Sequence, residues 1–334
     1  MRAAPTGDAA LTDPFVRPDV RAFLDMIAAM PQPEWPPETA AYRAQYLAMK
    51  DLVDLPLPEL ATVRDLAIPG PAGTIPARLF DVREKREPGP VVVFYHGGGF
   101  VIGDIDTHAA FTAEMSRMLD LPVVSVDYRL APEHRWPAAS DDAEAAARWV
   151  ASSPAELGLA VTSIAVAGDS AGGQLAAVAA IDLRDKPAAT PVIAQLLIYP
   201  ASDLGTTYPS YDQFSEGYVL TARSMEWFDD CYRADVTHPR ASPMRGGGLA
   251  GLPPAVIVTA GLDPIRDQGR AYAAGLIGAG IPVVFREAVG NVHGFVTLRR
   301  VIPSSQGDVA GMLAAFRDVV TEAEANRVMV QAAA

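Results

Sequence analysis

The sequence contains a single cysteine, Cys231, among its 334 residues. One thiol excludes a disulfide within the chain and suits a reducing compartment. No apolar run approaches the roughly 20 residues that a membrane-spanning helix needs. Residues 1–16 also lack the apolar segment of a secretory signal. We therefore expect a cytoplasmic protein without stable membrane insertion, in which Cys231 is packed or incidental rather than catalytic.

Basic residues are scarce: 27 Lys and Arg stand against 40 Asp and Glu, and the formal net charge is −13. This acidic balance argues against nucleic acid or an anionic membrane as the main partner. The phosphate-binding pattern G-x-x-x-x-G-K-[ST] is absent as well. The predicted partner is therefore a small molecule other than a nucleotide.

A short stretch raises the question of a metal site, because Asp104, Asp106 and His108 lie within five residues. Calcium and magnesium need more oxygen ligands, and zinc would need further His or Cys partners. Helix capping by Asp106 or Thr107 explains the stretch better. The sequence therefore predicts no metal and no cofactor.

Apolar runs alternate with helical segments through most of the chain. Continuous apolar runs are typical of strands buried on both faces, and the alternation predicts an α/β fold with a mostly parallel sheet covered by helices. The expected strands are 91–95, 123–126, 164–167, 193–199, 255–260 and 283–285, and the expected helices are 107–119, 140–152, 171–184, 268–279 and 307–324.

Two segments stand outside this rhythm. Residues 1–55 show helical, amphipathic spacing, for example at Phe23, Met26, Ile27 and Met30. About 50 residues follow the strand that ends near position 200, and eight of the chain's 25 aromatic residues lie between positions 199 and 232. So long and aromatic a connection predicts part of a lid, with ordinary core packing of a helical excursion as the alternative.

Ser170 lies in Gly168-Asp169-Ser170-Ala171-Gly172, between an apolar run and an alanine-rich stretch. The pattern G-x-S-x-G predicts a strand, a sharp turn and a helix with the serine at the apex, because glycine on both sides lets the strand and helix pack closely. Ser170 is therefore the predicted nucleophile.

A serine hydroxyl needs a base, and that base is usually a histidine held by a carboxylate. His293 follows a late strand, at the same sheet edge as Ser170, and is the expected base. Asp263 follows the preceding strand and is the preferred acid, while Asp203 and Asp267 remain rivals. Helix capping is the structural alternative for Asp263.

The negative charge that forms on the substrate needs hydrogen-bond donors. The run from His96 through three glycines to Phe100 follows the strand at 91–95 and leaves backbone N–H groups uncovered. The N–H of Ala171, directly after the nucleophile, is a further donor. A glycine run alone is weak evidence, because phosphate loops look similar.

Taken together, the motifs resemble those of the hormone-sensitive-lipase-like (bacterial group IV) esterases of the α/β-hydrolase fold. The resemblance covers roughly residues 60–330 and includes 96–100, 127–134, 168–173, 263–267 and 293–295. It implies a core of residues 56–202 and 251–334 under a helical cap built from residues 1–55 and an insertion at 203–250. Gln174 and Gln268 depart from the family's usual asparagine and glutamate, which affects detail around the site rather than the triad.

The resemblance also assigns roles. It implies that Ser170, Asp263 and His293 form the triad, and that the N–H groups of Gly98, Gly99 and Ala171 form the oxyanion hole. His96 would organise the glycine loop, with Gly97 and Asp169 as further supporting residues.

The predicted function is a serine carboxylesterase that hydrolyses short- to medium-chain carboxylic esters through an acyl-enzyme. An amidase or aryl-formamidase with the same triad is the alternative within enzymes, and a small-molecule receptor on this fold the alternative outside them. The receptor hypothesis is disfavoured because His293 is present. The family often pairs through the sheet edge, so the resemblance implies a homodimer.

Overall fold

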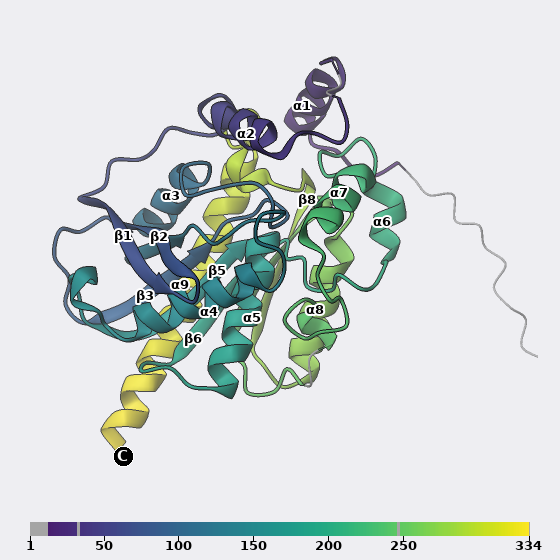
Figure 1. Ribbon diagram of the computed structural model, residues 1–334. Coiled ribbons are helices and arrows are strands. Elements are labelled where there is room, and N and C mark those ends of the chain that lie inside the picture. The colour runs from purple at the N-terminus through teal and green to yellow at the C-terminus, as the bar shows by residue number, and fades with distance from the viewer. Residues whose placement is uncertain (1–12, 32–33, 246–247, 334) are drawn as a thin grey trace, which may run out of the picture.

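An eight-stranded sheet crosses the molecule and carries helices on both faces (Figure 1). The computed structural model describes residues 13–31, 34–245 and 248–333. The strands are β1 (Thr62–Gly70), β2 (Gly73–Asp81), β3 (Gly89–Tyr95), β4 (Val123–Val126), β5 (Val161–Asp169), β6 (Val192–Ile198), β7 (Ala255–Leu262) and β8 (Val283–Val292). The helices are α1 (Pro18–Ala28), α2 (Thr39–Val53), α3 (Ala109–Leu119), α4 (Ala138–Ala151), α5 (Ala171–Asp185), α6 (Pro209–Phe214), α7 (Ala222–Tyr232), α8 (Arg266–Gly278) and α9 (Ser305–Ala333), with 3₁₀ turns η1 (Ala155–Leu157), η2 (Pro243–Arg245) and η3 (Phe295–Thr297). This architecture confirms the predicted α/β class.

The strand order is β1-β2-β4-β3-β5-β6-β7-β8. β1 and β2 form an antiparallel hairpin, and β2 pairs antiparallel with β4. From β4 through β3, β5, β6, β7 and β8, all neighbours are parallel. The carboxyl ends of β3, β5, β7 and β8 therefore share one edge of the sheet, which is where ligands bind in open α/β sheets.

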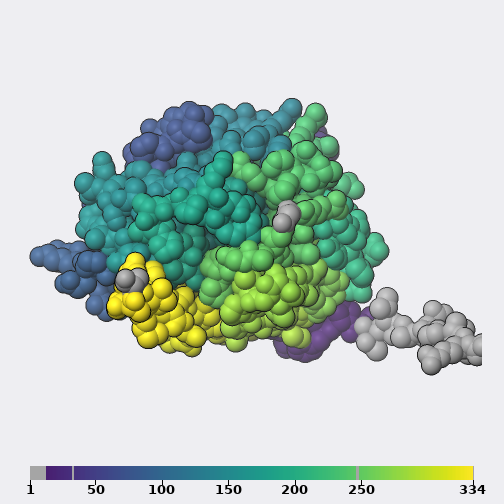
Figure 2. All heavy atoms as spheres, turned by 90° about the horizontal axis from the view of Figure 1, so that it is seen from below, coloured from purple at the N-terminus to yellow at the C-terminus, as the bar shows by residue number. Residues whose placement is uncertain are grey.

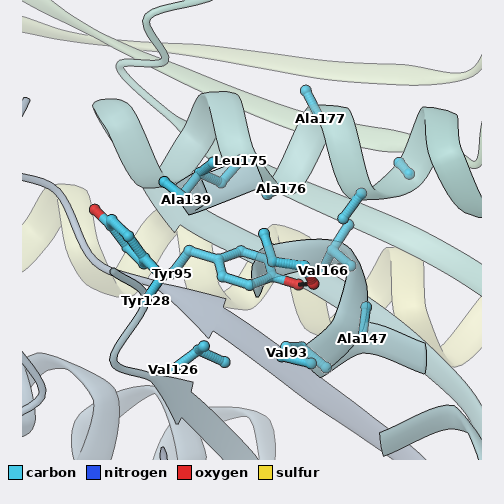
Figure 3. Packing of buried hydrophobic residues seen from close by; sticks show 14 of the residues in the cluster. Val93, Tyr95, Val126, Tyr128, Ala139, Ala147, Val166, Leu175, Ala176 and Ala177 are labelled. Atoms are coloured by element: carbon cyan, nitrogen blue, oxygen red, sulfur yellow. Dashed lines mark hydrogen bonds between the residues drawn. The ribbon is translucent and has the colours of Figure 1, made fainter. Parts of the chain in front are cut away.

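Both faces of the central strands β3 to β7 are buried, as the unbroken apolar runs predict. Alternate residues of β3 enter different clusters: Val91, Val93 and Tyr95 pack toward α4 and α5, while Val92 and Phe94 pack toward α3 and α9. Figure 3 shows the first cluster, where alanines of α4 and α5 lie against strand valines and allow a close approach of helix and sheet. Each fully buried Val or Leu contributes about 1.5–3 kcal/mol, so this doubly covered sheet forms a rigid base for the site.

Two elements run further than their apolar patterns predict. β8 continues to Val292. It is an edge strand, so its outward residues, such as Arg286, face solvent and interrupt the apolar run that would have marked its length. α9 extends to Ala333, and its end lies at the surface of the underside (yellow in Figure 2). Among the described residues, no helix combines the length and apolarity needed to cross a membrane.

The start of α3 corrects one prediction. The helix begins at Ala109, its N-cap is His108, and no side chain caps it. Asp106 instead accepts a hydrogen bond from Arg78, and the Thr107 hydroxyl bonds within the turn to Asp104. Capping by Asp106 or Thr107 was therefore wrong, because tertiary and turn contacts compete for both side chains.

The helices before β1 and after β6 pack on one another above the carboxyl edge (purple and green at the top of Figure 1). The Trp227 ring of α7 lies edge-on to Trp35 and Tyr42, with centroids 5.8 and 5.5 Å away. Of the predicted apolar face of α1, Phe23 is buried but Met26 is exposed. Within the segments predicted to form the cap, 1–55 and 203–250, residues 1–12, 32, 33, 246 and 247 lie outside the described part of the chain.

Candidate active site

Ser170 occupies the turn between β5 and α5, with φ 54° and ψ −118°. A non-glycine residue there is strained, at a cost of about 1–3 kcal/mol. The flanking glycines allow the turn, since a methyl group on Gly168 would overlap Gly172, and one on Gly172 would overlap the Tyr95 carbonyl. The Ser170 N–H donates to the Ile198 carbonyl at 2.8 Å and holds the turn against β6.

His293 and Asp263 come from the ends of the two neighbouring strands β8 and β7. His293 Nε2 lies 2.9 Å from Ser170 Oγ, and Nδ1 lies 2.7 Å from Asp263 Oδ2. Asp263 is fully buried, and its other oxygen accepts the Ile265 N–H at 2.9 Å. The three side chains form one hydrogen-bonded chain, in which the carboxylate can orient the imidazole toward the serine.

The two rival carboxylates have other partners. Asp203 accepts hydrogen bonds from Tyr208 and from Arg245. Asp267 lies in the first turn of α8 and accepts from Arg266 and Arg270. Within the described part of the chain, neither is hydrogen-bonded to His293, so Asp263 is the acid that the geometry favours.

The glycine loop after β3 presents backbone N–H groups beside Ser170. Gly98 and Gly99 have φ of 122° and 59°, which glycine adopts without strain. No acceptor among the described residues takes a hydrogen bond from the N–H groups of Gly98, Gly99 or Ala171. These three donors remain available to an oxygen of a substrate, as an oxyanion hole requires.

His96 and Asp169 lie under this loop. His96 Nδ1 is 2.8 Å from the Gly97 carbonyl oxygen, and its ring stacks on Tyr128 at 4.3 Å. Burial, together with the charge of nearby His108, lowers the pKa of His96 to about 4, so its ring is neutral at pH 7. Asp169 Oδ1 accepts the Gly97 N–H at 2.7 Å. The loop is thus anchored on the side away from its free donors.

Known proteins are similar to this chain in sequence and fold. A family model described as the alpha/beta hydrolase fold matches residues 92–297. The chain is 42% identical to Esterase LipI of Mycobacterium tuberculosis over 279 residues, which cover 81% of this chain and 87% of that protein. The chain belongs to the hormone-sensitive-lipase-like esterases. The resemblance inferred from the motifs is confirmed.

Two further comparisons agree. The esterase is 33% identical over 298 residues to Ethyl acetate hydrolase of Pseudomonas putida, covering 86% of this chain and 94% of that protein. A solved ester hydrolase from the metagenome of Lake Arreo superposes with a TM-score of 0.86 at 37% identity, covering 91% and 98% of the two chains. The esterase is a carboxylic ester hydrolase of the α/β-hydrolase fold, as predicted.

A cavity of about 500 Å³ opens onto Ser170 and His293. This volume lies within the usual range for small-molecule sites. Its walls include Tyr42 and Tyr46 of α2 and Phe228 of α7. Phe228 lies against the glycine loop so closely that a methyl group on Gly99 would overlap its ring. The motifs did not single out these side chains, because their proximity depends on how the two outer segments fold over the sheet.

His108 was also missed as a member of the site, although the sequence placed it at a helix start. It is 1% exposed, and its Nε2 lies 3.4 Å from Asp169 Oδ1. Its position twelve residues after His96 gives no signal by itself, because the contact depends on the path of the loop into α3.

No cluster of three or more potential metal ligands occurs among the described residues.

Proposed function

We propose that Ser170 is the nucleophile of this esterase, with His293 as its general base and Asp263 as the residue that orients the base. The supporting observation is the hydrogen-bonded chain from Ser170 through His293 to the buried Asp263, with contacts of 2.9 and 2.7 Å. Replacement of Ser170 by alanine is the direct test.

The reaction proceeds in two stages. His293 takes the Ser170 proton as Oγ attacks the ester carbonyl carbon, and the tetrahedral intermediate collapses as the same imidazolium protonates the departing alkoxide. An acyl-enzyme and an alcohol result. Water, deprotonated by His293, then attacks the acyl carbon, and the returned proton frees Ser170 and a carboxylic acid.

The oxyanion of both intermediates is assigned to the N–H groups of Gly98, Gly99 and Ala171, which have no acceptor among the described residues. Each such donor contributes about 10²–10³ in kcat. Ala171 begins α5, so the positive end of the helix dipole adds to the same stabilisation.

The proposed substrates are esters of short- to medium-chain acids. The cavity of about 500 Å³ is bounded by aromatic rings, and Phe228 covers the glycine loop directly. One relative carries the name Ethyl acetate hydrolase, which describes a two-carbon acyl group. We assign residues 1–55 and 203–250 to a cap that supplies these rings, over a core of 56–202 and 251–334.

Acyl chains of two to six carbons are expected to react faster than a twelve-carbon chain. In a series of p-nitrophenyl esters, kcat/KM should fall by about tenfold or more between hexanoate and dodecanoate, because the Phe228 ring restricts the depth of the cavity in this proposal, and methylenes that stay in water gain none of the ~0.8 kcal/mol that each would gain on burial. Phe228→Ala should flatten this fall. Phe15→Ala, which changes an exposed ring outside the cavity, should leave the profile unchanged. A wild-type preference for dodecanoate would contradict the proposal.

We also propose that the esterase forms a homodimer through β8. This strand is the sheet edge, and it exposes Val284, Phe285 and Val289 by 38, 40 and 54%. An exposed apolar edge strand can pair antiparallel with its own copy about a twofold axis, which extends the sheet and covers these side chains.

Light scattering after size exclusion tests the dimer. The wild type is expected at twice the 35.3-kDa chain mass. Phe285→Glu would place two like charges at the pairing site and should give the monomer, whereas Met26→Glu, on α1, should not. A wild type that stays monomeric as its concentration is raised would refute the pairing. We also propose a cytoplasmic location, which fractionation of cells tests.

A further inference from the structure

The glycine loop after β3 packs on a second histidine–carboxylate pair, formed by the buried side chains of His108 and Asp169. We propose that His108 is a positioning residue for ester hydrolysis, which holds the Asp169 carboxylate and through it the Gly97 peptide in place. The inference rests on the proposed role of the glycine loop as the oxyanion hole. Its elements are the 3.4 Å contact from His108 Nε2 to Asp169 Oδ1 and the 2.7 Å hydrogen bond from the Gly97 N–H to the same oxygen.

The surroundings of His108 fix its ring. Nδ1 lies 3.0 Å from Thr107 Oγ1. That hydroxyl donates to the Asp104 carbonyl at 2.8 Å and accepts the Asp104 N–H, so its remaining capacity is that of an acceptor. Both ring nitrogens of His108 therefore face oxygen atoms. The Asp104–Thr107 turn thus holds the ring against Asp169.

The charge of the pair explains how a buried carboxylate is tolerated beside the nucleophile. Asp169 is 4% exposed, and burial alone would raise its pKa, but the charge and hydrogen bond of His108, with smaller contributions from His96 and the Gly97 N–H, hold it below its usual value. Within the described part of the chain, His108 is the one ion-pair partner of Asp169.

The mechanical link to the oxyanion hole is short. A methyl group on Gly97 would overlap the Asp169 carboxylate, so the loop and the carboxylate are in tight contact. The next two peptides carry the free N–H groups of Gly98 and Gly99. The Tyr199 hydroxyl donates to the other Asp169 oxygen at 3.3 Å, so Tyr199 and His108 each hold one oxygen of the carboxylate. Loss of His108 would let the carboxylate turn and the donors shift.

A pair of substitutions at position 108 separates positioning from packing. The glutamine amide nitrogen reaches the place of Nε2, whereas the asparagine amide reaches only that of Nδ1. His108→Gln should keep kcat for p-nitrophenyl acetate within about threefold, and His108→Asn should lower it by about 10–100-fold, a fraction of the ~10²–10³ expected for a lost oxyanion donor. KM should change by less than about threefold in both, because His108 does not line the cavity.

Two readouts distinguish this role from a folding defect. Titration with a p-nitrophenyl phosphonate counts the competent active sites, so that kcat can be calculated per active site. Partial unfolding alone would leave this kcat unchanged. The inhibition constant of a trifluoromethyl ketone, whose adduct carries an oxyanion, should rise in His108→Asn by the same factor as kcat/KM falls.

A second variant, Thr107→Val, removes the acceptor at His108 Nδ1 and should also lower kcat. It keeps the test independent of the folding of the position 108 variants. His134→Asn, at an exposed histidine, is the matched control.

Equal kcat per active site in His108→Asn and wild type would overturn the proposal, and so would equal losses in the asparagine and glutamine variants. Either result would leave the catalytic assignment intact. Failure of the proposed function is a different observation, since wild-type enzyme would then hydrolyse p-nitrophenyl acetate without phosphonate labelling of Ser170.

Discussion

Ser170→Ala is expected to lower kcat on p-nitrophenyl butyrate by about 10⁶-fold, the loss seen when a triad serine is removed from other hydrolases. In the proposed mechanism this hydroxyl forms the acyl bond, and among the described residues His293 Nε2, 2.9 Å away, is hydrogen-bonded to no other hydroxyl or thiol. Residual turnover of about 10³–10⁴ over the uncatalysed reaction should persist, because the glycine loop and the cavity still bind the transition state. Initial rates at high enzyme concentration measure the remainder.

Labelling with a fluorescent phosphonate accompanies the kinetics. The wild type should bind one label per chain and Ser170→Ala none, while both unfold at similar temperatures because a single hydroxyl is lost. Cys231→Ser is the control, since it removes the one thiol of the sequence from a half-buried position outside the triad. Labelling that persists in Ser170→Ala, or that disappears in Cys231→Ser, would contradict the assignment of Ser170 as the nucleophile.

The location of the triad candidates could be predicted from the sequence because the relevant physics is local or topological. The G-x-S-x-G turn is dictated by close packing around Ser170, which the Gly172–Tyr95 contact shows directly. His293 and Asp263 follow strands of one parallel sheet, so their loops share an edge whatever the helices do. The order of motifs along the chain identifies the same three residues.

The parts that could not be predicted depend on contacts between distant segments. His108 reaches Asp169 only because the loop after β3 turns back under the glycine run, and its neighbours Asp106 and Thr107 have partners that no helix-start pattern reveals. Phe228 reaches the glycine loop through the packing of α7. The length of β8 was missed because an edge strand with exposed charges carries no continuous apolar signal.

Asp263→Asn is expected to lower kcat by about 10⁴-fold with little change in KM. The Ile265 N–H donates to Asp263 Oδ1, so the asparagine carbonyl must remain there and its NH₂ group must face His293 Nδ1. Nδ1 then has to accept a hydrogen bond, so the ring proton moves to Nε2. The protonated Nε2 points its N–H at Ser170 Oγ and cannot accept the serine proton.

The matched control is Asp267→Asn, which changes a rival carboxylate whose partners are Arg266 and Arg270. Its kcat should stay within about threefold of the wild type, because the His293 imidazole keeps its tautomer. Phosphonate labelling of Asp263→Asn should reach full stoichiometry slowly, since Ser170 is intact and only its activation is lost. Imidazole ¹⁵N resonances of His293 at pH 8 report the tautomer directly, with the proton on Nδ1 in the wild type and on Nε2 in the variant. A proton that stays on Nδ1, or a loss below tenfold, would show that Asp263 does not orient the base.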